Sequence, residues 1–341
     1  MKPVPFLSVI VPCRDEAAYL GPCLDSILAS GYPEERLEIL VADGRSQDGT
    51  RELAQSYAAR YAQVHVIDNP LQITPAALNR ALDRARGDII ARLDAHATVS
   101  PGYFSRAVEC LQSSGAANVG GRMQTVTRDC GPFAEPIRLA LTSPFGVGNS
   151  RFRTGPPAFQ NSTPCYVDTV FGGCWPREVF LKIGRFNERL ERSQDIEFNQ
   201  RLRRSGGKIL LTPLMESRYY ARATLRLFLG HNWDNGVWAV LPFAYSHGIP
   251  VRWRHLAPLA FVSALLLSAL LIPKLPWLFA LILAPYLALS LAVSCAIAWK
   301  LRDPRLLILQ PIAFWSLHLP YGAGSLWGAL RAFCVLARKY K

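Results

Sequence analysis

Three long stretches near the carboxyl end of the chain contain no charged residue. They cover residues 256–273, 275–299 and 306–330 and hold 18, 25 and 25 residues. About 20 apolar residues are enough for a helix to cross the hydrocarbon core of a bilayer. Buried helices of soluble domains seldom run this far without a charge. The sequence therefore predicts hydrophobic membrane helices over residues 256–341.

The first two stretches form a predicted helical hairpin, because Lys274 and two nearby prolines separate them. Lys and Arg concentrate on the cytoplasmic side of membrane helices. Residues 1–255 are therefore expected in the cytoplasm. The basic residues that flank the open end of the hairpin are Arg252, Arg254, His255, Lys300, Arg302 and Arg305.

The third stretch allows two interpretations, and both remain open. A full span would place Arg338, Lys339 and Lys341 outside the cytoplasm, against the positive-inside rule. The alternative is a re-entrant or interfacial helix, which the interrupting residues favour. These residues are Pro311, Pro320, Gly322 and Gly324.

The formal net charge of +13 also points to a membrane. Residues 256–341 carry +7 of this charge and residues 1–255 carry +6. Because the basic residues flank apolar stretches, attraction to anionic lipid explains them better than binding to nucleic acid. The eight cysteines include no C-x-x-C pair, so neither a zinc ribbon nor a redox motif is indicated.

Upstream of these stretches, apolar runs alternate with helical periodicity. This alternation predicts an α/β fold with a mainly parallel sheet flanked by helices. Strands are expected at 7–11, 37–41, 64–67 and 89–93, and helices at 16–29, 50–61 and 74–85. After residue 100 the pattern loosens, and residues 144–164 are predicted to form a loop. Further strands are expected at 117–126 and 166–171 and a helix at 195–205.

An amphipathic segment precedes the apolar stretches. Residues 225–241 contain Trp233 and Trp238, which favours an interfacial helix near the point of membrane entry. The expected domains are a cytoplasmic α/β domain over residues 1–222, an interfacial region over 223–255 and a membrane domain over 256–341. The membrane domain would contain two or three hydrophobic helices, depending on the third stretch.

Four acidic residues stand out by their positions. Glu16, Asp43 and Asp94 each follow a predicted strand, and Asp195 opens a later helix. The carboxyl ends of parallel strands meet at one edge of a sheet, where nucleotides bind in open α/β folds. Taken singly, Glu16 and Asp195 could be acids favoured at a helix start, and Asp43 could cap a turn. Their common position favours a binding site instead.

Four segments resemble the successive motifs of the family 2 glycosyltransferases, which have the GT-A fold. The segments are VPCRDE (11–16), ADGRSQDGT (42–50), LDAHA (93–97) and SQDIEFNQRLRRSGGKI (193–209). Their order and spacing extend the resemblance over roughly residues 5–240. LDAHA and the membrane tail also resemble exopolysaccharide enzymes, particularly the succinoglycan-type membrane glycosyltransferases. That resemblance implies a bacterial inner membrane and a catalytic domain in the cytoplasm.

On the donor side, the resemblance implies roles for the first three motifs. The first motif would form a base-binding loop, and Asp43 would read the uracil or ribose edge. Asp94 and His96 occupy the D-x-D positions, of which the first contacts the nucleotide and the last ligates a metal. Arg92 and Arg14 are candidate phosphate contacts, although each could equally be a surface arginine. The matching residues of the base-binding loop are Pro12, Arg14 and Glu16.

On the acceptor side, the resemblance makes Asp195 the general base. Gln194 stands before it, where the family usually has Glu. A second segment resembles the loop that lines the acceptor. Its residues are Gly172, Gly173, Cys174, Trp175 and Arg177.

His96 replaces the second acid of the D-x-D pair and leaves three interpretations open. It could ligate a metal with a bias toward Mn²⁺, because Mg²⁺ prefers oxygen ligands. It could donate a hydrogen bond directly to the diphosphate. It could also be a structural histidine beside the sheet edge.

Together these inferences predict an inverting glycosyltransferase. Its expected donor is a nucleotide-diphosphate sugar, in the first place a UDP-sugar, and its acceptor a polyprenyl-diphosphate-linked saccharide. A divalent metal, Mn²⁺ or Mg²⁺, is the expected cofactor. One alternative is a polyprenyl-phosphate glycosyltransferase, whose acceptor phosphate needs no base. Another is a non-catalytic nucleotide-binding scaffold of a membrane assembly complex.

Overall fold

The structure is a computed structural model that describes residues 3–128, 131–154, 163–222, 224–245 and 253–339. Its contacts divide the chain into two compact units. The first unit combines Met1–Gln124 with Arg151–Tyr220, and the second combines Thr125–Ser150 with Ala221–Lys341. The assignment of catalytic, interfacial and membrane roles to regions of the chain stays a prediction.

The first unit begins with four parallel strands in the order β3-β2-β1-β4. Their register aligns Cys13 with Asp43 and Asp43 with Asp68, so the carboxyl ends of three strands lie side by side. This half of the sheet agrees with the predicted alternation. The strands are β1 (Leu7–Cys13), β2 (Leu37–Asp43), β3 (Val64–Asp68) and β4 (Ile89–Arg92).

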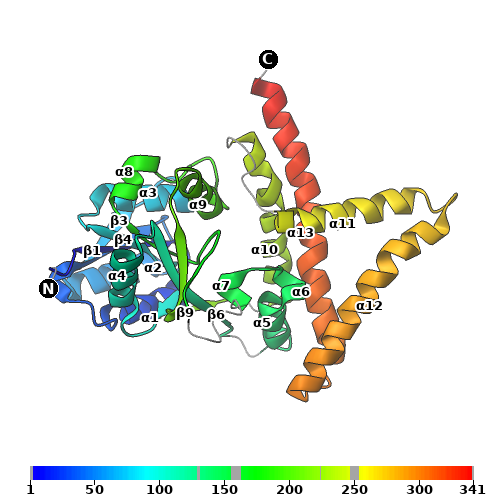
Figure 1. Cartoon of the computed structure of the whole chain (residues 1–341), viewed down its shortest axis with the longest axis horizontal. Coiled ribbons are helices and arrows are strands. Elements are labelled where there is room, and N and C mark those ends of the chain that lie inside the picture. Colours follow the sequence, from blue (N-terminus) through cyan, green and yellow to red (C-terminus); the bar gives the residue numbers. More distant parts are fainter. Residues whose placement is uncertain (1–2, 129–130, 155–162, 223, 246–252, 340–341) are drawn as a thin grey trace. The chain divides into compact units, whose positions relative to one another are not determined.

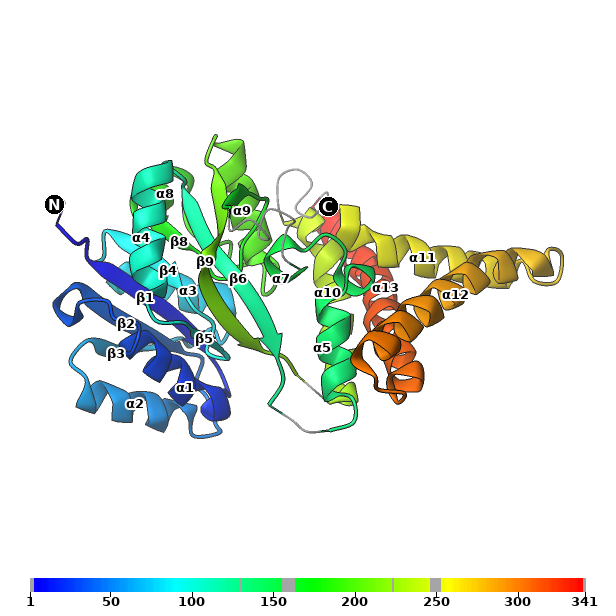
Figure 2. The ribbon, with the colours of Figure 1, turned by 60° about the horizontal axis from the view of Figure 1, so that its bottom comes forward.

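Helices cover both faces of these strands (Figures 1 and 2). On one face Val9 and Ile39 pack with Leu24 of α1 (Ala17–Leu28), and on the other Ile10 and Leu40 pack with Leu78 of α3 (Thr74–Arg84). Successive strand residues thus enter opposite cores, as the two-residue repeat of a strand requires. The other helices of this unit are η1 (Glu34–Arg36), α2 (Thr50–Arg60), α4 (Tyr103–Ser114), α7 (Arg151–Thr154), α8 (Glu178–Ile183) and α9 (Gln194–Arg204).

The sheet continues past β4 with antiparallel strands, so it is mixed rather than mainly parallel. Its remaining order is β4-β8-β6-β9-β5, and β7 pairs with β9. The pairs β4–β8, β6–β8, β5–β9 and β7–β9 are all antiparallel. The strand predicted at 166–171 is confirmed only at Tyr166, the last residue of β7. The strands are β5 (Ala97–Val99), β6 (Asn118–Val126), β7 (Cys165–Tyr166), β8 (Cys174–Pro176) and β9 (Ile209–Tyr220).

The segment predicted to be a loop, residues 144–164, contains two short helices. They are α6 (Pro144–Val147) and α7 (Arg151–Thr154). Pro144 takes an early position in α6, where its missing N–H costs nothing, and the Ser143 hydroxyl accepts a hydrogen bond from Phe145 N. The part of the prediction that concerns residues 155–162 lies outside the described residues.

The second unit is helical. Its helices α11 and α12, of 18 and 26 residues, are long and apolar enough to cross a membrane. The third apolar stretch lies within one continuous helix, α13, that includes both of its prolines. The elements are α5 (Ala134–Thr142), α6, α10 (Leu225–Val240), η3 (Leu241–Ala244), α11 (Trp253–Leu270), α12 (Pro276–Leu301) and α13 (Leu306–Lys339).

Glycines bring α10 and α13 into close contact. A side chain at Gly236 of α10 would collide with the Tyr321 carbonyl oxygen, and one at Gly324 or Gly328 of α13 would collide with backbone oxygens of α10. Ser325 Oγ donates a hydrogen bond to Gly236 O at 3.1 Å across the same interface. Small residues allow such close backbone approach between helices. The predicted helix at 225–241 therefore exists, and one of its faces is covered by α13.

Candidate active site

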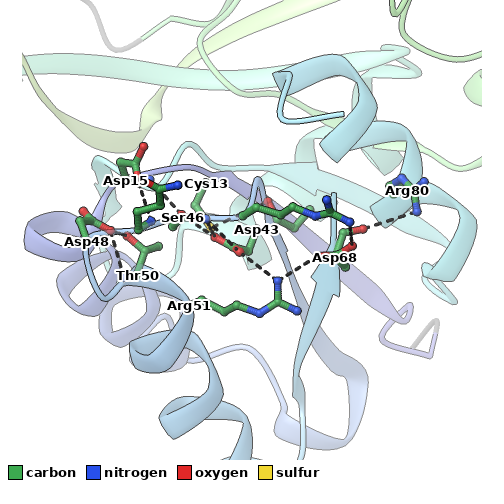
Figure 3. Close-up of polar contacts among 12 residues, drawn as sticks. Cys13, Asp15, Asp43, Ser46, Asp48, Thr50, Arg51, Asp68 and Arg80 are labelled. Atoms are coloured by element: carbon green, nitrogen blue, oxygen red, sulfur yellow. Dashed lines mark hydrogen bonds and ion pairs between the residues drawn. The ribbon is translucent and has the colours of Figure 1, made fainter. Parts of the chain in front are cut away.

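The loops that follow β1 and β2 are tied together at the carboxyl edge of the sheet (Figure 3). Asp15 accepts a hydrogen bond from Gln47 N at 2.9 Å, and its own N–H donates to Ser46 Oγ at 2.9 Å. Asp48 accepts from Ala17 N at 3.0 Å and from Thr50 N at 3.1 Å. These contacts fix the turn of the ADGRSQDGT motif against the VPCRDE motif. The two segments therefore form one continuous surface, as their shared position predicted.

Asp43 lies at this edge but is completely buried. Its carboxylate accepts hydrogen bonds from the Ser46 hydroxyl at 2.5 Å and from Ser46 N at 3.4 Å, and lies 3.5 Å from the Arg51 guanidinium. In this arrangement Asp43 shapes the turn. The more exposed carboxylate is that of Asp68, which pairs with Arg51 at 2.9 Å and with Arg45 at 3.6 Å.

Sequence reasoning missed Arg51 and Asp68. Asp68 is the last residue of β3 and aligns with Asp43. The rule that selected the other acids, an acid at the carboxyl end of a parallel strand, would also have found Asp68. The same rule could not find Arg51, which is not an acid at a strand end. Arg51 reaches the carboxylates of Asp43 and Asp68 only because it lies on helix α2.

Asp94 and Arg92 form a partly buried ion pair at the end of β4. Arg92 Nε lies 2.8 Å from Asp94 Oδ1, and the two side chains are 9% and 18% exposed. Burial by itself raises the pKa of Asp94, but the charges of Arg92 and His96 hold that pKa below its ordinary value. Burial lowers the pKa of Arg92, whereas attraction to Asp94 and Asp195 raises it and prevails. Arg92 therefore pairs with the acid of the D-x-D position and is also attracted by Asp195.

His96 lies in the turn after β4, beside Glu16. Its Nδ1 is 3.0 Å from Glu16 Oε1, and its ring packs edge-on against Tyr219 with centroids 5.0 Å apart. Glu16 precedes α1 and its N–H donates to Thr50 Oγ1 at 2.8 Å. The structure thus brings Glu16 to the D-x-D segment. A carboxylate that binds one imidazole nitrogen fixes the orientation and tautomer of a histidine.

The remaining donor-side candidates lie nearby. Pro12 pairs with Ala42 across β1 and β2. Arg14 is exposed and donates a hydrogen bond to Gln72 O at 3.3 Å. The side chain of Arg14 also packs against Gly44. Pro12 and Arg14 therefore lie at the same sheet edge as Asp43.

Gly172 and Gly173 lie against the end of β4. Both have a positive φ, 63° and 116°. A Cβ at Gly172 would lie 2.6 Å from Arg92 O, and Arg92 N donates a hydrogen bond to Gly173 O at 3.0 Å. Only glycine permits this close approach in this backbone conformation. The two glycines therefore lie next to Arg92, as a loop near the reaction centre would require.

The structure does not bring the rest of the segment 172–177 to the carboxyl edge of the parallel strands. Cys174 and Trp175 are buried, and Trp175 packs in a core of aromatic rings with Phe180 and Phe198. Arg177 donates hydrogen bonds to the carbonyls of Gly87, at 2.8 Å, and Ala85. These carbonyls precede β4, so Arg177 lies at the amino end of that strand. The reason is that β8 runs antiparallel to β4 and carries the chain away from Asp94.

Asp195 lies in the first turn of α9 and is partly exposed, whereas Gln194 is buried. One turn later, Asn199 accepts a hydrogen bond from Asn118 Nδ2 at 2.9 Å and donates one to Thr169 Oγ1 at 2.9 Å. This buried chain anchors α9 to β6. Ser193 takes the N-cap position of α9 in the left-handed conformation, with φ 62°.

The two residues expected to hold a metal, Asp94 and His96, both lie in the turn after β4. Among the described residues, no group of three or more His, Cys, Asp or Glu side chains is arranged to hold a metal. Two ligands still fit a cation that arrives with a substrate, because Mg²⁺ and similar ions often combine one or two side chains with substrate phosphates. Arg92 engages Oδ1 of Asp94, which makes Oδ2 the candidate ligand atom.

Comparison with known proteins identifies the family. The model of glycosyl transferase family 2 matches residues 8–178, which include the loops after β1 and β2, the LDAHA segment and the two glycines. This chain belongs to glycosyl transferase family 2.

Two relatives of this family 2 chain match it over nearly their whole length. Succinoglycan biosynthesis protein ExoA of Rhizobium meliloti (strain 1021) is 29% identical over 318 residues, or 93% of this chain and 92% of that protein. A Methanococcus voltae protein is 25% identical over 327 residues, or 93% of this chain and 95% of its own length. Its name is dolichyl N-acetyl-alpha-D-glucosaminyl phosphate 3-beta-D-2,3-diacetamido-2,3-dideoxy-beta-D-glucuronosyltransferase.

A solved structure shows the fold of this family 2 chain. The mannosyltransferase PcManGT from Pyrobaculum calidifontis, in complex with GDP-Man and Mn²⁺, aligns with a TM-score of 0.58 at 19% identity. The alignment covers 96% of this chain and 88% of that one. The mixed sheet flanked by helices is therefore the GT-A fold, as the motifs predicted.

Proposed function

We propose that this glycosyltransferase is an inverting enzyme that transfers a sugar from a nucleotide diphosphate to a lipid-linked saccharide. The observation that carries this proposal is the 2.8 Å ion pair of Arg92 with Asp94 at the end of β4, together with the attraction of Asp195 for the same arginine. Arg92 connects the acid expected at the donor diphosphate with the acid expected at the acceptor hydroxyl. A base and a leaving group on the two sides of one reacting carbon are what an inverting displacement needs.

The residues would divide the reaction as follows. Asp195 accepts the proton of the acceptor hydroxyl as its oxygen attacks the anomeric carbon of the donor sugar. The bond from that carbon to the diphosphate breaks on the opposite face of the sugar, and the diphosphate leaves as an anion beside Asp94 and His96. When bound at these two residues, a divalent cation would supply positive charge to the diphosphate. Arg92 keeps Asp94 ionised, which a metal ligand must be.

The first proposed donor is a UDP-sugar. The surface formed by Arg14, Arg45, Arg51 and Asp68 offers both hydrogen-bond donors and a carboxylate. The uracil edge presents an N–H between two carbonyl oxygens, so it requires this mixture. We assign the reading of the base to Asp68 together with the buried Asp43, which sets the turn beside it.

The proposed acceptor is a polyprenyl-diphosphate-linked saccharide at the cytoplasmic face of a bacterial inner membrane. The support is the pair of candidate spans α11 and α12 together with the basic residues near the start of α11 and the end of α12. These residues are Arg254, Lys300, Arg302 and Arg305. The name of the Rhizobium meliloti relative refers to biosynthesis of an exopolysaccharide, succinoglycan. That of the Methanococcus voltae relative refers to a dolichyl-linked sugar phosphate. Assembly of a surface glycan on a lipid carrier is consistent with both.

The experiment is donor turnover by the full-length chain with a panel of UDP- and GDP-sugars and total membrane lipid extract. Mn²⁺ or Mg²⁺ is titrated against EDTA for the wild type and for His96→Ala. We expect metal-dependent transfer to lipid, and a higher metal requirement for His96→Ala. Transfer that is indifferent to EDTA would contradict the metal at Asp94 and His96, and transfer to soluble glycans alone would contradict the lipid-linked acceptor. Nucleotide binding without turnover of any donor would contradict an enzyme.

A further inference from the structure

Tyr219 connects His96 to a second basic residue. It lies on β9 opposite Ala97 of β5, the residue that follows His96. The Tyr219 ring packs edge-on against the His96 imidazole, with centroids 5.0 Å apart. Cζ of Arg153 lies over the same tyrosine ring, 5.3 Å from its centroid. One aromatic ring therefore holds a guanidinium in the neighbourhood of the D-x-D segment.

Arg153 comes from α7, and its guanidinium lies over the ring of Tyr219 on β9. Within this single helical turn Arg151 is exposed, whereas Arg153 is partly buried. The ring of Phe152 also lies near the Arg153 guanidinium, at 5.7 Å. Aromatic rings bind a guanidinium without neutralising it, and its planar fork of N–H groups matches the oxygens of a phosphate. The sequence alone predicted a loop here and gave Arg153 no role.

Arg153 carries its positive charge in a poorly hydrated position. Burial lowers the pKa of Arg153, and attraction to Tyr219 opposes this shift only in part. A positive charge in a poorly hydrated position is stabilised when an anion binds next to it. Under the proposed function, the anions that reach His96 are phosphates, either those of the donor diphosphate or that of the lipid-linked acceptor.

We propose that Arg153 is a phosphate-binding residue of the active site, held by the Tyr219 ring so that it contacts a substrate phosphate beside His96. This inference rests on the proposed function, because that function brings phosphates to His96. Arg153 takes no part in bond making. It adds positive charge to the phosphate and fixes its position.

The test compares three variants of the full-length chain. Arg153→Ala removes the cation, Arg153→Lys keeps it, and Arg151→Ala is the matched control because Arg151 is exposed on the same helical turn. Binding of UDP, GDP, uridine and guanosine is measured by calorimetry. Transfer kinetics are measured with varied amounts of total membrane lipid extract. Because nucleosides lack phosphate, they report any general damage to the site.

Loss of a hydrogen bond to a charged group should weaken binding by about tenfold or more. If Arg153 contacts the donor, Arg153→Ala should lose this factor for the diphosphates but not for the nucleosides, with partial recovery in Arg153→Lys. If it contacts the acceptor, the KM for the lipid should rise by that factor while nucleotide binding stays unchanged. Either result supports the proposal and identifies the source of the phosphate.

Three results would overturn the proposal. In the first, neither the diphosphate affinity nor the KM for the lipid differs from that of Arg151→Ala. In the second, nucleosides and diphosphates weaken equally, which would show a structural role. In the third, the wild-type chain binds no nucleoside diphosphate at all. That result is recognisable without any variant, and it removes the proposed function together with this inference.

Discussion

Nδ1 of His96 lies 3.0 Å from Oε1 of Glu16, although 80 positions separate these residues in the chain. The first belongs to the turn after β4, and the second precedes α1. This contact joins two motifs that sequence reasoning placed at one sheet edge but assigned to different tasks. It allows Glu16 to orient His96, in addition to the place in a base-binding loop that the sequence predicted for Glu16.

The Glu16–His96 contact predicts that Glu16→Gln weakens metal binding. Side chains that orient a ligand histidine typically contribute 10–100-fold to metal affinity. We expect the Mn²⁺ concentration for half-maximal transfer to rise by about tenfold, while the rate at saturating Mn²⁺ changes little. Glu35→Gln, an exposed carboxylate of η1, is the control. An unchanged Mn²⁺ requirement in Glu16→Gln would argue that His96 does not ligate the metal.

A second prediction concerns the dependence of stability on pH. Glu38 is buried and accepts hydrogen bonds from Ser8 Oγ at 2.5 Å, from Arg86 N at 2.6 Å and from Arg86 Nε at 2.9 Å. Burial by itself raises the pKa of Glu38, but the hydrogen bonds from Ser8 and Arg86 hold it below its ordinary value. A carboxyl group with a lowered pKa stabilises the folded state above its ordinary pKa. That stability disappears as the pH falls through the folded value.

We therefore expect Glu38→Gln to lower the free energy of unfolding by about 2 kcal/mol at neutral pH. The difference from wild type should shrink as the pH falls from about 5 toward 3, because the wild-type carboxyl is then protonated as well. Denaturant unfolding at a series of pH values measures both effects, with Glu35→Gln as the exposed control. A difference that stays constant over this range would show that the charge of Glu38 does not contribute.

A third prediction separates two glycines of the same helix. Gly236 of α10 faces the Tyr321 carbonyl of α13, whereas a Cβ at Gly230 would meet no atom within 4 Å. Gly236→Ala should push α10 and α13 apart and lower the Tm, since overpacking typically costs about 1–3 kcal/mol. Gly230→Ala should be neutral or stabilising by up to about 1 kcal/mol, because alanine favours helix. Equal effects of the two substitutions on thermal unfolding would contradict the close packing of α10 on α13.

A fourth prediction concerns orientation in the membrane. Lys274 is exposed in the turn between α11 and α12. If these helices cross the inner membrane as a hairpin, this turn lies on the periplasmic side. A membrane-impermeant maleimide should then label Lys274→Cys in spheroplasts more strongly than the parent chain, which keeps its own cysteines. Labelling of Lys274→Cys only after the membrane is opened would place the turn in the cytoplasm and reverse the proposed topology.

Sequence reasoning was most successful where local pattern and fold agree. The four parallel strands and the helices between them follow from apolar runs of strand length that alternate with helical periodicity. The strands at 97–99 and 174–176 were missed because each has three residues and is defined by pairing with distant strands. The helical turns within residues 144–164 were hidden by the Gly, Pro and Ser content that suggested a loop.

The same limit applied to the site. The convergence of Glu16, Asp43 and Asp94 at one edge was predictable, because parallel strands share their carboxyl ends. The displacement of Arg177 was not, because the segment 172–177 reads as one loop. In the structure, β8 spans about 3.3 Å per residue and takes Arg177 to the opposite end of β4. The link from Arg92 to Asp195 depends on the packing of α9, which no local pattern encodes.

The most direct test of this account is transfer from the preferred nucleotide-sugar to lipid extract by Asp195→Asn, measured beside nucleotide binding. Glu191→Gln, an exposed acid shortly before α9, serves as the matched control. If Asp195 is the base, Asp195→Asn should bind the nucleotide like wild type but transfer the sugar about 100-fold more slowly or worse. Transfer at the wild-type rate would contradict this mechanism and favour a lipid phosphate acceptor, which attacks without a base.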